Sequence, residues 1–372
     1  MAVLAKIKNK INPRRVTTWY HQYERKISSF FLVGGFITDW LTLKRVDSVW
    51  ENIWVIGHIF MIATFIILLH RLENKSIEGL DIEVTRFWFT NTLQFFFGGI
   101  LSVFLVFYFR SAELSTSWLF VLILLVAFWA NEALKKHLER LVFQLSMFFL
   151  SLFCVLIYLV PVIMHRIGGG TFILSGFLSL IIMLGFLHLF IHFSGEKFYQ
   201  NNRVVAFSIL GIYFVMNIFY FTNIIPPIPL SLKDSGVYHS LQKNAGGGYV
   251  GEYENFGWRS YFKIYTDFHA DESNSVYAYS AIFSPTSLNI TVIHKWQYFD
   301  QSKNAWVSYD EVSLPVIGGR GEGFRTYSVK NNLAPGKWRV NVETEGGQVI
   351  GRLRFNIIRS ASPASLETKV LD

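Results

Sequence analysis

A change of composition at Pro226-Pro227 constrains the fold of this chain more than any other feature of its sequence. Before these prolines the sequence contains long apolar stretches, and after them it alternates apolar and polar residues in short runs. The seven apolar stretches cover residues 28–43, 50–69, 87–109, 114–130, 141–164, 171–193 and 204–225. A helix needs about 20 apolar residues to cross the hydrocarbon core of a bilayer. The sequence therefore predicts a membrane α-helical bundle of about seven transmembrane helices, followed by a separate all-β domain.

The first stretch is the least certain span. Residues 28–43 are few for a crossing and include Asp39, a carboxylate within an apolar run. The sequence is compatible with a tilted span or with a re-entrant segment at this place. The choice matters because an even number of spans would leave both ends of the chain on one side of the membrane.

The distribution of basic residues predicts the orientation of the bundle. The net charge of +8 is concentrated in residues 1–230, which carry +7. If all seven stretches span, 15 of the 19 Lys and Arg residues of this part lie on the side of the N-terminus. Cytoplasmic loops carry such an excess of positive charge. We therefore expect a cytoplasmic (inner) membrane protein with its N-terminus in the cytoplasm and its C-terminal domain outside it. The lipid bilayer explains the basic residues, so we expect no nucleic-acid partner.

The same patterns divide the chain into five parts. Lys, Arg and aromatic residues alternate before the first stretch at a spacing typical of a basic amphipathic helix on the membrane surface. The predicted parts are a basic amphipathic cytoplasmic segment (1–27), the transmembrane domain (28–225), a spacer and flexible loop (226–252), the extracytoplasmic β domain (253–360) and a tail (361–372).

Period-two alternation in the predicted β domain indicates strands with one buried face. Val292, His294 and Trp296 alternate with Ile293 and Lys295, and Trp338 and Val340 alternate with Lys and Arg residues. About seven short strands separated by turns are typical of an immunoglobulin-like sandwich. The chain has a single cysteine, Cys154 in an apolar stretch, so no disulfide within the chain supports this domain.

Four polar side chains of the predicted spans are candidates for function: Asp39, His58, His188 and His192. Ionisable residues inside a membrane are costly and often functional. Asp39 and His58 form a candidate proton or ion pathway, although a local ion pair of Asp39 near the loop that follows it also fits. His188 and His192 lie four residues apart on one helix face. They provide only two metal ligands where a site needs three or four, and an interfacial position explains them equally well, so we expect no metal site.

Aromatic and cationic side chains of the predicted β domain form a candidate binding surface. They are His294, Trp296, Arg325, Tyr327, Lys330 and Trp338. Aromatic rings with interleaved cations bind sugars and anionic polymers. Alternate aromatic residues also fill the core of a β domain, and this second interpretation stays open. No catalytic constellation and no cofactor motif is visible, so we expect no cofactor and favour a protein without enzymatic activity.

The predicted β domain also resembles a known family. The residues that carry the resemblance are Val292, His294 and Trp296, then Phe324–Ser328 with Lys330, then Pro335, Gly336, Trp338, Val340 and Val342, and finally Gly347 with Gly351. This pattern is similar to the C-terminal domain of bacterial membrane proteins grouped as domain of unknown function 2914. The stretches Phe31–Asp39 and Leu41–Ser48 resemble the first membrane hairpin of such proteins. The resemblance implies a bacterial origin and this architecture, and it implies no activity.

Two functions from different classes are consistent with these observations. In the first, the bundle anchors a β domain that binds a protein or an envelope polysaccharide outside the cytoplasm. In the second, the bundle is a transporter or an ion or proton channel that uses Asp39 and His58. An intramembrane enzyme is a distant third because no cluster of catalytic residues is recognisable.

Overall fold

The computed structural model describes most of the chain, with gaps. The described residues are 23, 30, 33–43, 45–74, 81–133, 140–244, 248–254, 263–270, 274–285, 290–316, 323–360 and 365–371. The predicted amphipathic segment 1–27 therefore lies, apart from residue 23, outside the described residues. The chain forms two compact units. One comprises residues 1–107, 121–159 and 173–218, and the other comprises residues 108–120, 160–172 and 219–372.

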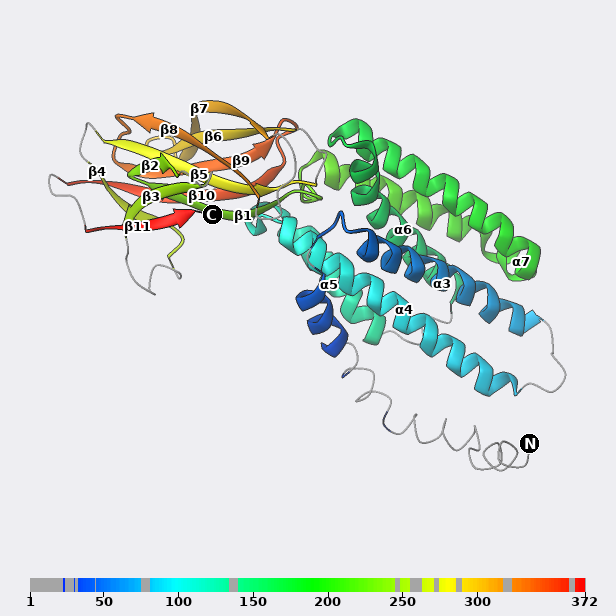
Figure 1. Ribbon diagram of the computed structural model, residues 1–372. Coiled ribbons are helices and arrows are strands. Elements are labelled where there is room, and N and C mark those ends of the chain that lie inside the picture. The colour runs from blue at the N-terminus through cyan, green and yellow to red at the C-terminus, as the bar shows by residue number, and fades with distance from the viewer. Residues whose placement is uncertain are drawn as a thin grey trace, which may run out of the picture. The chain divides into compact units, whose positions relative to one another are not determined.

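The first part of the chain is helical, as the apolar stretches predict. Its labelled helices are α3 (Val49–Asn74), α4 (Ile82–Ser111), α5 (Leu114–Ala133), α6 (Leu141–Met164) and α7 (Gly169–Phe221) (Figure 1). Six described stretches are long and apolar enough to cross a membrane: Val49–Leu72, Ile82–Ser111, Leu114–Asn131, Leu141–Met164, Gly169–Phe193 and Phe198–Phe221. They correspond to the last six predicted spans.

The first predicted span differs from the other six. Residues 33–42 are helical, whereas residues 28, 29, 31 and 32 lie outside the described part of the chain. At 1.5 Å per residue, a ten-residue helix covers about 15 Å, which is about half of the hydrocarbon thickness. Whether residues 28–43 span therefore stays a prediction.

Helix α7 comprises two arms that fold back on each other. The rings of Phe172 and Tyr220 stack with centroids 3.8 Å apart, although the two residues lie near opposite ends of α7. A Cβ atom added at Gly176 would lie only 2.9 Å from the ring of Tyr213. Both contacts require the two arms to be antiparallel. Helix α7 therefore contains both the sixth and the seventh predicted spans.

The second part of the chain is a β domain of three sheets. Its strands are β1 (Ser231–Tyr238), β2 (Ser240–Lys243), β3 (Tyr249–Glu254), β4 (Thr266–Ala270), β5 (Ser275–Phe283), β6 (Ile290–Asp300), β7 (Ala305–Val316), β8 (Phe324–Asn331), β9 (Gly336–Thr344), β10 (Val349–Arg359) and β11 (Leu366–Leu371). The strand orders are β4-β10-β9-β6-β7, β1-β5-β8 and β11-β3-β2. The pairs β6–β7, β6–β9 and β9–β10 are antiparallel, and β4 runs parallel to β10.

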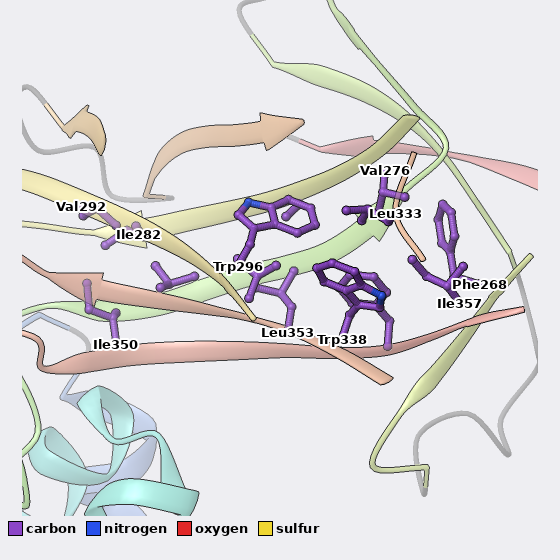
Figure 2. Packing of buried hydrophobic residues seen from close by; sticks show 14 of the residues in the cluster. Phe268, Val276, Ile282, Val292, Trp296, Leu333, Trp338, Ile350, Leu353 and Ile357 are labelled. Atoms are coloured by element: carbon purple, nitrogen blue, oxygen red, sulfur yellow. The ribbon is translucent and has the colours of Figure 1, made fainter. Parts of the chain in front are cut away.

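The predicted alternation determines which side chains form the main core. Trp296 of β6 lies opposite Val340 of β9, and both are fully buried. Trp338 and Leu353 join them from β9 and β10, and Ile282 joins them from β5 in another sheet (Figure 2). The five-stranded sheet and the sheet of β5 therefore share one apolar core.

Strand β5 is buried on both of its faces. Val276, Ala278 and Ile282 face the main core, whereas Tyr279 and Ala281 belong to a second, tyrosine-rich cluster. Tyr238, Leu371 and the partly buried Leu241, Tyr249, Tyr253, Tyr277 and Tyr327 complete this cluster. Because β2, β3 and β11 provide several of these side chains, their sheet covers the second face of β5.

Two predicted boundaries differ from the structure. The segment 226–252, expected to be a spacer and loop, contains β1, β2 and the first residues of β3. The segment 361–372, expected to be a tail, contains β11, whose Leu366 pairs with Glu254 of β3. Strand β11 lacks apolar alternation because all its side chains except Leu371 are exposed. Its backbone ladder leaves no signal in the sequence.

Candidate functional site

A polar cavity of about 570 Å³ lies within the helical unit. Its polar lining residues include Asp39 from the helical segment 33–42, His58 from α3, Asn91, Gln94 and Ser102 from α4, and Asn131 from α5. Its apolar lining includes Phe30, Phe36, Trp54, Phe95 and Phe128. Four separate helical segments thus bring hydrogen-bonding side chains into one cavity of a largely apolar bundle.

Asp39 is anchored in this cavity by α4. Ser102 Oγ donates a hydrogen bond of 2.5 Å to Asp39 Oδ2. Asp39 is half-buried, and Ser102 is 2% exposed. One turn before Asp39, the ring of Phe36 packs against Phe128 of α5, with centroids 5.8 Å apart. The segment that carries the carboxylate is therefore fixed against both α4 and α5.

His58 lines the same cavity and has a defined orientation. Its Nδ1 lies 2.9 Å from the carbonyl oxygen of Trp54, one turn earlier in α3. A carbonyl oxygen only accepts, so Nδ1 carries the proton and donates, which leaves Nε2 as the acceptor of the neutral ring. Nε2 points toward α4, since a Cβ atom at Gly99 would lie 2.6 Å from it. The glycine thus provides the space that the imidazole occupies.

Gln94 and Asn131 connect α4 to α5 at the cavity wall. Gln94 Nε2 donates to the carbonyl oxygen of Asn131 at 3.3 Å, and Asn131 Nδ2 donates to the carbonyl oxygen of Gln94 at 3.1 Å. Asn131 is 2% exposed. Within the described part of the chain, its buried Oδ1 has no hydrogen-bond partner. A buried acceptor without a donor is costly, so this oxygen favours a ligand or water that donates to it.

Asp39 and His58 line the same cavity, and the other two candidate histidines do not. The side chains of His188 and His192 are exposed on the first arm of α7, and neither lines the cavity. Among the described residues, no group of three or more His, Cys, Asp or Glu side chains is arranged to hold a metal ion.

Three of the six candidate surface residues of the β domain lie in its core. His294 and Trp296 are fully buried, and Trp338 is 2% exposed. As members of an exposed binding surface, these three residues were wrongly placed, because the core required their large side chains. Arg325, Tyr327 and Lys330 are partly exposed on β8. Lys330 pairs with Asp310 of β7.

His294 belongs to a buried network between two sheets. Its Nε2 lies 2.9 Å from Ser280 Oγ of β5, and its Nδ1 lies 2.9 Å from Ser328 Oγ of β8. The indole nitrogen of Trp296 donates to the same Ser328 Oγ at 2.9 Å. Burial lowers the pKa of His294 to about 4, so the imidazole is neutral at physiological pH. The sequence did not reveal this Ser–His contact, and its full burial makes it a structural link rather than a catalytic pair.

The sequence also missed Gln94 and Asn131 as members of a site. Both are amide side chains at or near the predicted spans 87–109 and 114–130, where polar residues are unusual. That signal was available, but it could not show that the two helices turn these side chains toward Asp39 and His58.

The architecture thus defines a class: a helical bundle, whose described part has six stretches of membrane-spanning length and apolarity, joined to a C-terminal β domain. Residues 289–357, which include β6, β7, β8, β9 and most of β10, match the family described as protein of unknown function DUF2914. The match confirms the resemblance of the C-terminal region.

Other comparisons add nothing to the family match. No curated protein matches this chain. One similar solved structure is Pseudomonas fluorescens alkylpurine DNA glycosylase AlkC bound to DNA containing an abasic site analog, at 8% identity and a TM-score of 0.21, covering 85% of this chain and 99% of that chain. Such a low TM-score carries no argument about fold or activity.

Proposed function

We propose that the helical bundle transports protons, alone or with a small polar solute, through the cavity that contains Asp39 and His58. The single observation that carries this proposal is the convergence of both ionisable side chains in one polar cavity of an apolar bundle. Asp and His side chains within membrane helices are typical of proton relays. The unpartnered Oδ1 of Asn131 adds a place for a donor on the solute or on water.

The cavity has the properties that a relay requires. Imidazoles change their charge between about pH 5 and pH 8, and a carboxylate in the same cavity is a second group that can take up and release a proton. Nε2 of the neutral His58 is an acceptor, and Asp39 accepts from Ser102. The amides of Gln94 and Asn131 hold the wall in place through main-chain bonds.

A flux assay with full-length protein tests this proposal. We expect liposomes that contain the wild type to take up protons when a pH gradient and a counter-ion path are imposed, with an enclosed pH dye as readout. Asp39→Asn and His58→Gln should each abolish that flux. His192→Gln removes a histidine outside the cavity and should leave it unchanged. Absence of any flux above protein-free liposomes, with or without candidate solutes, would overturn the proposal.

We also propose that the β domain lies outside the cytoplasm of a bacterial cell, with seven spans before it. The excess of Lys and Arg on the N-terminal side supports this orientation. The segments Tyr108–Phe120 and Val160–Phe172, which hold loops expected outside the cytoplasm, belong to the same compact unit as the β domain, which supports it further. A reporter enzyme fused after residue 230 should be active in the periplasm. Activity in the cytoplasm would contradict seven spans in this orientation.

A second candidate function is binding of an envelope protein or polysaccharide by the β domain, whose shared core supports an immunoglobulin-like sandwich. The observation that favours it is an aromatic group around Tyr327, whose ring lies 5.5 Å from that of Tyr249 and 5.9 Å from that of Tyr277. All three are partly exposed. Full-length protein should bind isolated envelope polysaccharide, and Tyr327→Ala should weaken binding, whereas Tyr309→Ala on β7 should not. Equal binding by Tyr327→Ala and wild type would remove this candidate.

A further inference from the structure

Two arginines lie directly opposite each other on the outer face of the five-stranded sheet. Arg354 of β10 is the cross-strand partner of Arg339 of β9, and Arg352 follows on the same face of β10. These three residues form the arginine cluster. Like charges directly opposite in an antiparallel pair destabilise a sheet. The cluster therefore needs negative charge from elsewhere.

The protein supplies the cluster with one ion-pair partner among its described residues. Arg354 forms an ion pair of 2.9 Å with Glu113. Arg352 donates hydrogen bonds to Asn341 Oδ1 and, at 2.7 Å, to Ser115 Oγ. Arg339 donates to Gln297 Oε1 at 2.7 Å, and its guanidinium lies 4.3 Å from the ring centroid of Trp306.

Burial and mutual repulsion lower the pKa values of two of these arginines. Burial, and then the nearby Arg352 and Arg354, lower the pKa of Arg339 to about 10. Burial and the charge of Arg354 also lower the pKa of Arg352. Of the acids on this face, Glu311 pairs with Lys295, and the charge of Glu343 offsets only part of the lowering of the pKa of Arg339 and Arg352. Burial raises the pKa of Glu343, which accepts a hydrogen bond from Asn341.

The cluster also has a defined depth relative to two helix ends. Glu113 and Ser115 belong to Tyr108–Phe120, a segment of the same compact unit as the β domain. That segment joins the end of α4 to the start of α5, and both helices are long and apolar enough to span. Span ends lie at the depth of lipid headgroups, where Trp and Tyr are enriched. Trp306 lies beside Arg339, and Tyr265 lies beneath Lys337 at 5.4 Å.

We propose that the arginine cluster binds the phosphate group of an anionic membrane phospholipid. Arg339 and Arg352 have neutral partners and supply the charge, and their planar guanidinium groups match two phosphate oxygens at once. Glu113 holds Arg354 and Ser115 in position, since Ser115 Oγ also donates to Glu113 Oε1 at 2.8 Å. This inference is independent of the cavity and of proton flux.

Native mass spectrometry of full-length protein released from nanodiscs tests the proposal. The discs contain equal amounts of phosphatidylglycerol and phosphatidylethanolamine. Wild type should retain phosphatidylglycerol preferentially. The double variant Arg339→Gln/Arg352→Gln should retain about tenfold less, a change that corresponds to about 1.4 kcal/mol of binding free energy. Equal retention by wild type and the double variant would overturn the proposal.

A matched control removes the same charge elsewhere on the domain. Lys263 and Lys369 form exposed ion pairs with Asp267 and Asp234. Lys263→Gln/Lys369→Gln should therefore retain phosphatidylglycerol like the wild type. A loss as large as that of the arginine variant would show that net charge alone attracts the lipid, and would contradict a specific site.

Two further arms keep the test decisive. If the glutamine variant does not fold, Arg339→Lys/Arg352→Lys keeps the charge but loses the planar fork, and it should retain less phosphatidylglycerol than wild type; retention equal to wild type would overturn the site. Soluble glycerol phosphate should not displace the lipid at millimolar concentration. Ready displacement would indicate a free-phosphate site and would overturn the lipid assignment.

Discussion

Ser102 Oγ donates a 2.5 Å hydrogen bond to Asp39 Oδ2, which joins two residues that are 63 positions apart in the sequence. The bond links the helical segment 33–42 to α4. Both residues of the bond line the cavity whose wall includes His58. This one contact carries both the packing of the first helical segment and the position of the acid.

Ser102→Ala should therefore weaken both the bundle and its flux. Loss of the hydroxyl leaves a half-buried carboxylate without its donor, which should lower the free energy of unfolding by about 1 kcal/mol. Thermal unfolding of the full-length protein in detergent measures this change. Thr92→Ala is the control on the same helix, because Thr92 Oγ1 donates to the carbonyl oxygen of Trp88, one turn earlier in α4. An equal shift in both variants would contradict the role of Ser102.

Gly99→Ala should displace His58 from the cavity wall. The added Cβ would lie 2.6 Å from Nε2 and 2.9 Å from Cδ2 of the ring, so the imidazole must move. We expect loss of flux together with a lower unfolding temperature. Gly57→Ala, one residue before His58, has no atom within 4 Å of its new Cβ and should stabilise α3 by about 0.5–1 kcal/mol. Normal flux in Gly99→Ala would show that the position of His58 is unimportant.

The buried His294 should make the protein less stable in mild acid. Its pKa is lowered to about 4 in the folded state by burial, whereas an exposed histidine has a pKa of about 6.5. Between about pH 6.5 and pH 4, His294 is therefore protonated in the unfolded chain and neutral in the folded chain. The stabilisation is complete above about pH 6.5, is lost as the pH falls toward 4, and amounts to about 3 kcal/mol.

Unfolding of wild type and His294→Gln from pH 8 to pH 4 measures this contribution. Glutamine retains one donor and one acceptor for Ser280 and Ser328 but does not titrate in this range. The difference in stability between the two proteins should shrink as the pH falls. A difference that is constant from pH 8 to pH 4 would show that His294 does not titrate as its burial requires.

Gly351→Ala should destabilise the β domain more than substitution of a nearby glycine. A Cβ atom at Gly351 would overlap Cδ2 of Leu232 on β1, so the packed side chain of Leu232 would have to move. Overpacking of this kind costs about 1–3 kcal/mol. Gly346→Ala is the control, because its Cβ would meet only Thr344 Oγ1, at 3.7 Å. Similar unfolding temperatures for both variants would contradict this reading of the β1–β10 contact.

The sequence predicted the helices well because the signal for a span is local. Twenty apolar residues in a row identify a helix such as α6 without knowledge of its neighbours. The same reasoning marked Asp39 and His58, since an ionisable side chain is conspicuous in such a run. Gln94 and Asn131 lie in the same cavity because of how α4 and α5 are rotated about their axes. The composition of a span does not predict that rotation.

The β domain was harder to predict at the level of single residues. Alternation in β6 separates His294 and Trp296 from Ile293 and Lys295, but it does not say which set is buried. The aromatic residues with interleaved cations were compatible with an exposed binding surface and with a buried core, and the structure places His294, Trp296 and Trp338 in the core. Strand β11 was missed because hydrogen bonds to β3 hold it, and backbone bonds have no hydrophobic signature.

The burial of β5 on both faces limits how this domain can change in evolution. Its aliphatic side chains fill one core and its tyrosines fill the other, in strict alternation from Val276 to Tyr279. A single inserted or deleted residue would exchange the two sets, so that rings would enter the aliphatic core and small side chains would face the tyrosines. Relatives of this protein should therefore tolerate substitutions in β5 but keep its length unchanged, and length variation should be confined to the connections outside it.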